Sequence, residues 1–273
     1  MPLRISSTAL TQFWHEIHEA HGFDFRDYSE DSIKRRIVHF MNEKKIADLE
    51  HLQAKILVSE SFFEEFIQEM SVTVTEMFRD EKFFKALREK VIPRLATYPF
   101  IKVWLAGCAT GEEAYSIAIL LDEAGLSSRS LIYATDINQR SLQIAKEGLY
   151  PKEKMDAASQ NYMNSGGTGN LEQYYLSKYN SVIFTKNLKQ NLVFSPHNLA
   201  VDRSFNEFQL ILCRNVLIYF KQNLQNKVIN LFYDSLCPFG FLALGNKETI
   251  LFCDRNKSFD EVDRREKIYL KTG

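Results

Sequence analysis

The residues best suited to chemistry lie in the stretch between Ile101 and Asp136. An apolar run at 100–106 leads into a segment with Gly107 and Gly111, and a second apolar run ends at Asp136. This pattern predicts a strand, a glycine-rich turn, a helix and a second strand. In such a unit the glycines let the backbone turn closely beneath a ligand, and the terminal acid accepts hydrogen bonds from ribose hydroxyls. The stretch therefore predicts a site for a cofactor that contains adenosine.

The charge of the turn indicates which cofactor it suits. A dinucleotide site has glycine where this chain has Ala109, because a pyrophosphate approaches the start of the helix there. Glu112 and Glu113 follow in the first helical turn, and two carboxylates would repel a pyrophosphate. They suit a positively charged ligand such as S-adenosylmethionine (SAM). A P-loop is excluded because no Gly-Lys-Ser/Thr follows the glycines, and a turn without any ligand is the remaining alternative.

Further polar residues follow a second apolar run. Residues 208–213 are apolar apart from Gln209, which is typical of a buried parallel strand, and Arg214 and Asn215 come directly after them. Polar residues at the carboxyl end of such a strand face the crevice where α/β sheets bind ligands. Arg79 precedes the central strand and can reach the same cleft, although on its own it is an ordinary surface arginine. No cluster has the spacing of metal ligands, so no metal is expected.

The remaining segments must position these residues. Residues 1 to about 90 have the periodicity of helices, and Pro93 and Pro99 precede the central strand. We therefore predict a helical domain over residues 1–85 and an α/β domain over residues 86–273. Short apolar runs at 182–185 and 192–194 predict a small β subdomain inserted at about residues 155–195.

Composition sets limits on location and partners. The net charge of −1 gives no general attraction to nucleic acid or to a membrane surface, and no apolar run approaches the length of a membrane span. The N-terminus lacks the apolar core of a signal peptide, so the cytoplasm is the expected location. One predicted helix carries Lys34, Arg35, Arg36 and His39, with Lys44 and Lys45 beyond it. Such a run is either a solvated face or a docking surface for an acidic partner.

With these segments in place, the chain resembles the CheR family of chemotaxis-receptor methyltransferases, which are SAM-dependent enzymes that esterify receptor glutamates. The resemblance covers nearly the whole chain, and five segments carry it in the family's order. They are 73–80 (TVTEMFRD), 106–116 (AGCATGEEAYS), 134–137 (ATDI), 197–199 (HNL) and 213–220 (CRNVLIYF). The chain departs from the family at Thr73, where Asn is frequent, and at Met77, where Phe is frequent.

The resemblance implies a fold and a set of site residues. The fold is a Rossmann-like methyltransferase sheet with helices on both faces, an all-α N-terminal domain and a small inserted β subdomain. Arg79 and Tyr219 would flank the transferred methyl group. Besides Gly107 of the turn, the residues implied to line the SAM site are Thr73, Thr75, Arg79, Glu113, Asp136, Asn198, Leu199, Arg214 and Asn215.

The expected reaction needs no general base. A glutamate carboxylate has an unperturbed pKa of about 4.3, so it is already ionised at neutral pH. Arg79 and Tyr219 can orient it, and Arg214 suits an anionic acceptor better than an amine. We therefore expect a protein-glutamate O-methyltransferase that releases S-adenosylhomocysteine.

The expected partner follows from this reaction. It is the cytoplasmic helical region of a methyl-accepting receptor, bound by a monomer of this chain. In some members of the family the β subdomain also binds the receptor's C-terminal tail, and other members do not use a tail. Neither nucleic acid binding nor membrane insertion is expected. A SAM-binding sensor or scaffold without catalysis is the main alternative. An NAD-dependent dehydrogenase is disfavoured by Ala109 and Glu113.

Overall fold

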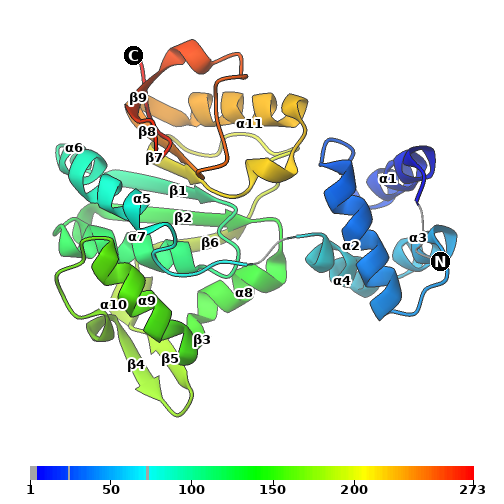
Figure 1. Cartoon of the computed structure of the whole chain (residues 1–273), viewed down its shortest axis with the longest axis horizontal. Helices are drawn as coiled ribbons and strands as arrows, with labels where there is room; N and C mark the ends of the chain where they lie inside the picture. The colour runs from blue at the N-terminus through cyan, green and yellow to red at the C-terminus, as the bar shows by residue number, and fades with distance from the viewer. Residues whose placement is uncertain (1–4, 24, 72–73) are drawn as a thin grey trace. The chain divides into compact units, whose positions relative to one another are not determined.

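The computed structural model describes residues 5–23, 25–71 and 74–273, which form two compact units (Figure 1). The first unit holds the chain up to residue 72 together with Tyr219–Lys227, and the second holds the remaining described residues. The predicted boundary at residue 85 lies later than this division. The difference arises because Phe83, Phe84 and Leu87 are buried in the core of the second unit.

Four helices build the first unit, as the periodicity of the sequence predicts. Trp14 lies at its centre, with its ring 5.0 Å from that of Phe13 and 5.9 Å from that of Phe66. Ser6, Asp48 and Ser59 cap helices through their side chains, whereas Ser29 occupies the expected cap position without such a bond. The helices are α1 (Ser7–His21), α2 (Glu30–Glu43), α3 (Leu49–Val58) and α4 (Glu60–Met70).

A seven-stranded sheet forms the centre of the second unit, with the order β6-β2-β1-β7-β8-β10-β9. The first five strands in this order run parallel, and β10 is antiparallel to both of its neighbours. Val103 of β1 lies level with Ile132 of β2 and with Leu210 of β7. The strands are β1 (Ile101–Ala106), β2 (Ser130–Asp136), β6 (Leu192–Pro196), β7 (Phe208–Cys213), β8 (Leu236–Leu244), β9 (Phe259–Asp263) and β10 (Ile268–Lys271).

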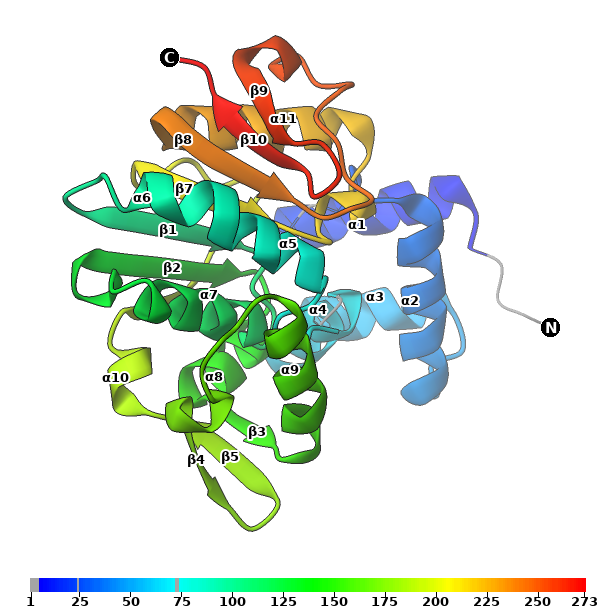
Figure 2. The same cartoon turned by 60° about the vertical axis from the view of Figure 1, so that its left-hand side comes forward.

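Helices cover both faces of this sheet, as predicted (Figure 2). Val103 and Leu105 of β1 belong to the core on one face, together with the helices at 81–95 and 112–123. Trp104 points to the opposite face, where its ring lies 5.3 Å from that of Phe232. The helical elements are α5 (Glu81–Ala86), the π-helical turn η1 (Leu87–Val91), α6 (Ile92–Leu95), α7 (Glu112–Glu123), η2 (Ser127–Arg129), α8 (Gln139–Glu147), α10 (Lys186–Lys189), η4 (Leu217–Tyr219), α11 (Gln222–Ser235) and η5 (Asn256–Ser258).

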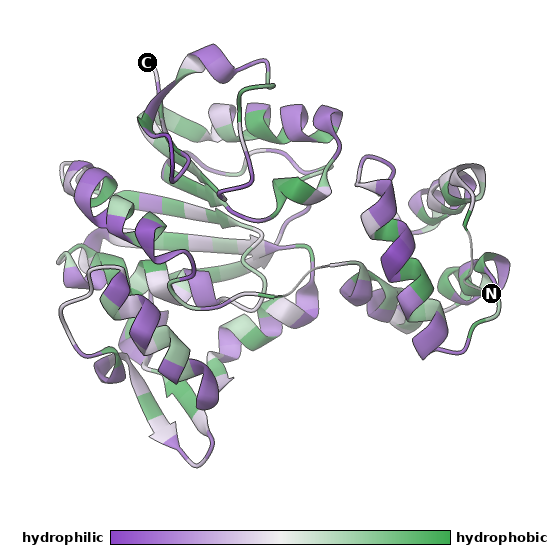
Figure 3. Ribbon diagram, viewed as in Figure 1, coloured by the Kyte–Doolittle hydropathy of each residue, from purple (hydrophilic) through white to green (hydrophobic). Residues whose placement is uncertain are grey.

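Hydrophobic residues are concentrated on the strands of the large sheet, while the outward faces of the helices are hydrophilic (Figure 3). This separation is the amphipathic pattern that buries one face of each helix against a sheet. The chain also reverses its direction of winding at β1, because β2 and β6 lie on one side of it and β7 and β8 on the other. Open α/β sheets bind ligands beside the carboxyl ends of the strands at such a point.

A small antiparallel sheet with the order β3-β5-β4 stands beside the large one in the second unit. It consists of β3 (Leu149–Pro151), β4 (Tyr175–Lys178) and β5 (Ser181–Phe184), with α9 (Glu153–Asn164) and η3 (Leu171–Tyr174) between its strands. The expectation that residues 192–194 join this subdomain was wrong, because β6 pairs with β2 in the large sheet. A short apolar run does not identify the strand with which it pairs.

Among the described residues, no helix combines the length and the hydropathy that crossing a bilayer requires.

Gly111 provides a test of the predicted turn. It begins α7 with a φ of 93°, and a Cβ built on it would lie 2.7 Å from the Cβ of Ala145. Left-handed strain and overpacking should together lower the free energy of unfolding of Gly111→Ala by about 2–4 kcal/mol. Gly125→Ala is the matched control, because Gly125 has a φ of 69° and nothing within 4 Å of a built Cβ.

The control should lose only about 1 kcal/mol, from backbone strain alone. Urea unfolding followed by circular dichroism measures both values. Equal losses in the two variants would show that the close approach of Ala145 has no energetic effect.

Candidate functional site

Five parallel strands bring polar residues to one edge of the sheet. Since β6, β2, β1, β7 and β8 are parallel, their carboxyl ends lie together. The residues at or just after these ends are Asn198, Asp136, Gly107, Asn215 and Glu248. All but the last were predicted from the sequence, and the fold thus unites four segments that are far apart in the chain.

Asp136 is held by the backbone on both sides. Its Oδ2 accepts a hydrogen bond of 2.8 Å from the N–H of Ala109, and its Oδ1 accepts one of 2.9 Å from Asn138. Burial raises the pKa of this carboxyl, and the backbone N–H donors of Asn138, Ala109 and Ile137 act in the opposite direction. A carboxylate has about four acceptor sites, so it can still accept a hydrogen bond from a ligand. Asp136 is therefore oriented before any ligand arrives.

Gly107 also lies where the prediction requires it. Its φ is 86°, and a Cβ at this position would lie 2.4 Å from Cγ2 of Val216. Glycine thus allows the turn after β1 to approach the turn after β7.

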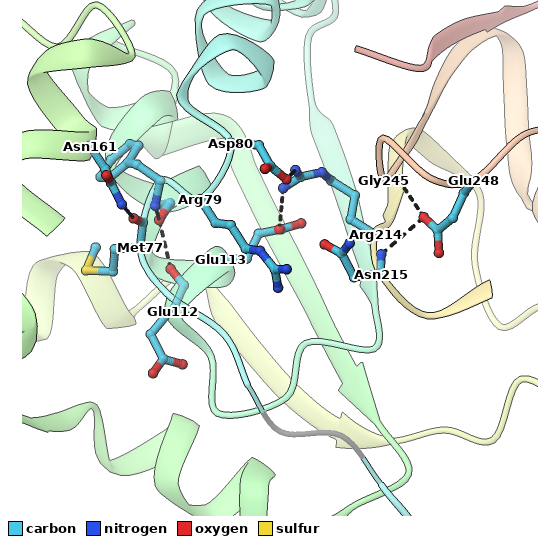
Figure 4. Close-up of polar contacts among 12 residues, drawn as sticks. Met77, Arg79, Asp80, Glu112, Glu113, Asn161, Arg214, Asn215, Gly245 and Glu248 are labelled. Atoms are coloured by element: carbon cyan, nitrogen blue, oxygen red, sulfur yellow. Dashed lines mark hydrogen bonds and ion pairs between the residues drawn. The ribbon is translucent and has the colours of Figure 1, made fainter. Parts of the chain in front are cut away.

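The two acids at the start of α7 have different environments. Glu112 is 1% exposed, and its carboxylate pairs with Lys154 at 2.9 Å and accepts a hydrogen bond from Thr110. Glu113 pairs instead with Arg214, at 2.7 Å. The side chains of Glu112 and Glu113 point in different directions (Figure 4). The expectation that both carboxylates meet a cationic ligand was therefore wrong, because Lys154 neutralises Glu112.

Arg214 is the most constrained charge of the site. Its side chain is fully buried, and it pairs with Asp80 at 2.6 Å as well as with Glu113. The guanidinium lies over the ring of Phe83, 3.9 Å from its centroid. Two carboxylates thus compensate one cation, and Arg214 is not available to attract an anionic acceptor. This arrangement corrects the argument that used Arg214 as a sign of a carboxylate substrate.

Arg79 has a different environment from Arg214. It is partly exposed, and none of the ion pairs among the described residues includes it. Its Nη1 lies 3.5 Å from the carbonyl oxygen of Val74. In Figure 4 the Arg79 side chain extends from the loop before α5 towards Glu113 and Asn215. Unlike Arg214, Arg79 can thus still bind an anion.

The other residues predicted for the site differ in how the structure describes them. Thr75 is partly exposed in the same loop as Arg79, whereas Thr73 lies outside the described residues. Asn198 shapes the turn after β6, since its side-chain oxygen accepts a hydrogen bond of 3.0 Å from the N–H of Ala200, and Leu199 is buried. The carbonyl of Tyr219 accepts a hydrogen bond of 2.7 Å from Ser29 within the first unit. The role of Tyr219 beside a methyl group stays a prediction.

Glu248 is a site residue that sequence reasoning missed. It is 4% exposed, and its carboxylate accepts hydrogen bonds from the N–H groups of Gly245, Asn215 and Val216 at 2.5, 3.1 and 2.8 Å. It thereby fixes Asn215, which has a φ of 60°. Burial raises the pKa of the Glu248 carboxyl, and these N–H donors oppose the shift. The sequence feature that could have identified Glu248 is its position shortly after the carboxyl end of β8, which is a parallel neighbour of β7.

The cationic run of α2 is largely paired with acids of the same unit. Lys34 pairs with Glu30 at 2.6 Å, and Lys44 pairs with Glu65 at 2.8 Å. Arg36 donates hydrogen bonds to the backbone carbonyls of Glu69 and Ser71 at the end of α4. Exposed ion pairs contribute only about 0–1 kcal/mol to stability, but they reduce the field that a partner meets. This helix presents mixed charge, which weakens its interpretation as a docking surface.

Comparison with known proteins gives a consistent result. The CheR methyltransferase all-alpha domain matches residues 8–71, and the CheR methyltransferase SAM-binding domain matches residues 73–268. A putative methyltransferase, Cher3 of Pseudomonas putida, is 44% identical over 94% of each chain. The chemotaxis protein methyltransferase of Listeria monocytogenes is 30% identical over 84% of this chain and 86% of its own length.

Further similarities are weaker. The chemotaxis protein methyltransferase of Escherichia coli is 28% identical over 88% of this chain and 83% of its own length. Among solved structures, the N-methyltransferase NodS of Bradyrhizobium japonicum aligns with a TM-score of 0.42 and 11% identity, over 82% of this chain and 98% of that one. The two domain matches together cover most of the sequence. The chain therefore belongs to the CheR family of SAM-dependent methyltransferases, with the all-α domain of that family followed by its SAM-binding domain.

Proposed function

We propose that this enzyme transfers the methyl group of SAM to glutamate side chains of a chemoreceptor-type signalling protein, forming glutamyl methyl esters. The observation that carries the proposal is the contrast between Arg79 and Arg214. Asp80 and Glu113 compensate Arg214, whereas Arg79 lacks an ionic partner among the described residues. A free guanidinium beside a methyl donor site suits an anionic acceptor, and two relatives bear the name chemotaxis protein methyltransferase.

The predicted residues fit SAM. When bound, SAM supplies a methyl group on a positively charged sulfur atom. Asp136, whose orientation is fixed by backbone N–H groups, would accept hydrogen bonds from the ribose hydroxyls. Glu113 places negative charge on the side of the crevice that would face the cationic part of the cofactor. The remaining residues proposed to line the site are Thr73, Thr75, Arg79, Gly107, Asn198, Leu199, Arg214 and Asn215.

The protein's part in the reaction is to position the acceptor. A glutamate carboxylate is already ionised at neutral pH, so no residue has to remove a proton. Arg79 and Tyr219 would orient one carboxylate oxygen towards the methyl group. Alignment of two reactants can lower a barrier by about 7–11 kcal/mol. The grip has to remain moderate, because binding the carboxylate too firmly would stabilise the ground state.

We further propose that a monomer acts in the cytoplasm on the helical cytoplasmic region of a methyl-accepting receptor. The small sheet β3-β5-β4 would bind the C-terminal tail of that receptor. Backbone pairing at a sheet edge is a common way to hold an extended peptide, and both β3 and β4 are edge strands.

The linkage of the transferred methyl group tests the proposed function. The enzyme is incubated with methyl-labelled SAM and candidate receptor fragments, and the labelled product is then treated with alkali. We expect label that is released as methanol, because a carboxylate ester hydrolyses in alkali. Alkali-stable label would indicate a nitrogen acceptor and contradict the proposal. SAM binding without any transfer would favour a sensor or scaffold.

Arg79→Ala should lower the turnover number by about 10²-fold, because an acceptor that is misplaced by about 1 Å loses that much rate. Label transfer at saturating SAM and receptor fragment measures the change. Arg94→Ala is the matched control, since Arg94 is an exposed arginine of α6, before β1. It should retain the activity of the wild type. Equal activities of Arg79→Ala and the control would remove Arg79 from the reaction.

Glu248→Gln tests the turn that carries Asn215. In this variant an amide NH₂ replaces one acceptor oxygen and faces an N–H donor, so one hydrogen bond is lost. The turnover number should fall about 10-fold, which is the change in rate that corresponds to the free energy of one hydrogen bond. Glu207→Gln, at an exposed glutamate before β7, is the control and should not change turnover.

Stability adds a second readout for Glu248. Its pKa is raised in the folded state, so its contribution to stability is present below the ordinary glutamate pKa and is lost as pH rises through the raised value. The wild type should therefore lose stability relative to Glu248→Gln as the pH rises above the ordinary glutamate pKa of about 4.3. An unchanged difference above this pKa would show that the Glu248 carboxyl is not perturbed.

A further inference from the structure

Arg79 stands between two residues with unusual backbone conformations. Phe78 has a φ of 51° and Asp80 a φ of 61°. Left-handed conformations are uncommon for residues other than glycine, and for a bulky residue such as Phe78 they are true outliers. Such a conformation persists only where the surrounding structure enforces it. The loop that carries Arg79 must therefore be held by its neighbours.

Two of these neighbours belong to elements of the cofactor site. The N–H of Phe78 donates a hydrogen bond of 3.0 Å to Oγ of Ser116, which is buried on α7. The carboxylate of Asp80 pairs with Arg214 at the end of β7. These contacts fix the backbone on both sides of Arg79. Neither contact involves Met77, where the chain enters the loop, so Met77 must be held by another element.

Helix α9 holds that segment. Nδ2 of Asn161 donates a hydrogen bond of 3.1 Å to the carbonyl of Met77, two residues before Arg79. The next residue of α9, Tyr162, is buried with its ring 5.2 Å from that of Phe78. Figure 4 shows the side chain of Asn161 directed at Met77, on the side of the loop opposite to Arg214.

The glycine-rich segment after α9 serves the same contact. A Cβ on Gly167 would lie 2.4 Å from the ring of Tyr162, and the N–H of Gly169 donates a hydrogen bond of 3.0 Å to the Tyr162 hydroxyl. Oγ of Ser165 donates one of 2.7 Å to the Tyr162 carbonyl. Glycine lets residues 165–169 close over this aromatic ring, which itself supports Phe78.

We propose that Asn161 and Tyr162 of α9 are positioning residues that act through Arg79. The proposal rests on the proposed function, because it assigns these residues to the acceptor side of that site. Asn161 fixes the Met77 carbonyl and Tyr162 fixes the Phe78 ring, so the backbone reaches Arg79 in one conformation. A reacting group has to be held within about 0.5 Å by residues that are themselves immobilised. Methyl transfer therefore depends on a helix that lies outside the cofactor site.

The test compares two asparagines of α9. Asn161→Ala and Asn161→Asp both remove the donor to Met77, and the second keeps the size of the side chain. Asn164→Ala and Asn164→Asp are the matched controls. Asn164 is exposed one turn further along α9, and its amide contacts the side chain of Glu81 at 3.4 Å. Thermal unfolding of each variant shows whether it folds, and Asn161→Asp carries the test if Asn161→Ala does not fold.

We expect the Asn161 variants to lower the turnover number about 10-fold at saturating SAM and receptor fragment, and the Asn164 variants to change it less than about twofold. The decisive comparison repeats each Asn161 substitution in the Arg79→Ala variant. The turnover number of the double variant is compared with that of Arg79→Ala alone, with enough enzyme to measure this residual rate. If Asn161 acts through Arg79, replacing Asn161 in the Arg79→Ala background should lower the turnover number less than about twofold.

Two results would overturn the proposal. One is equal turnover in the Asn161 and Asn164 variants. The other is an equal loss of turnover when Asn161 is replaced in the wild type and in Arg79→Ala. A merely structural role of Asn161 would produce this equal loss. Neither result depends on whether the proposed function is right, because failure of that function would appear as absent transfer in the wild type.

Discussion

The buried positive charge of Arg214 is the constraint on which the site depends. A guanidinium that is removed from water requires compensating charge and hydrogen bonds, since the cost of an unpaired buried ion is several kcal/mol. Asp80 and Glu113 provide this compensation from two different segments, and Phe83 covers the guanidinium from a third direction. One side chain thereby joins the loop before α5, the start of α7 and the end of β7. These three segments meet at the carboxyl edge of the parallel strands.

This arrangement also explains the charge distribution of the crevice. Because Asp80 and Glu113 share a single cation, the trio carries a net negative charge. Asp136 and Glu248 add two carboxylates that are held by backbone N–H groups. A negative crevice suits the cationic cofactor of this family. Under the proposed function, Arg79 would meet the anionic acceptor, so the two reactants would be received by opposite charges on different segments.

Several features of this site were accessible from the sequence, because strong local signals encode them. Gly107, Gly111 and Asp136 mark a strand-turn-helix-strand unit whose geometry is nearly fixed by the backbone. Helical periodicity predicted the four helices of the first unit. The largely apolar run at 208–213 predicted a buried strand with polar residues at its end, where Arg214 and Asn215 do lie.

Long-range pairings were not accessible. Adjacent acids look alike in a sequence, yet Lys154 neutralises Glu112, and Glu113 turns to Arg214. The pairing of β6 with β2 and the bonds of Glu248 to the turn after β7 join residues that are distant in the chain. The same limit applies to Asn161, whose partner Met77 lies 84 residues earlier. Tertiary contacts of this kind decide which charges remain free.

The coupling between Asp80 and Arg214 tests the central claim most directly. A double-mutant cycle would compare the free energies of unfolding of the wild type, Asp80→Asn, Arg214→Met and the double variant, in the transition of the second unit. With 32% of its side chain exposed, Asp80 should contribute a coupling of about 1–2 kcal/mol. Asp80→Asn would then be nearly neutral in the Arg214→Met background. An equal cost of Asp80→Asn in both backgrounds would show that the two residues do not depend on each other, and would contradict the account.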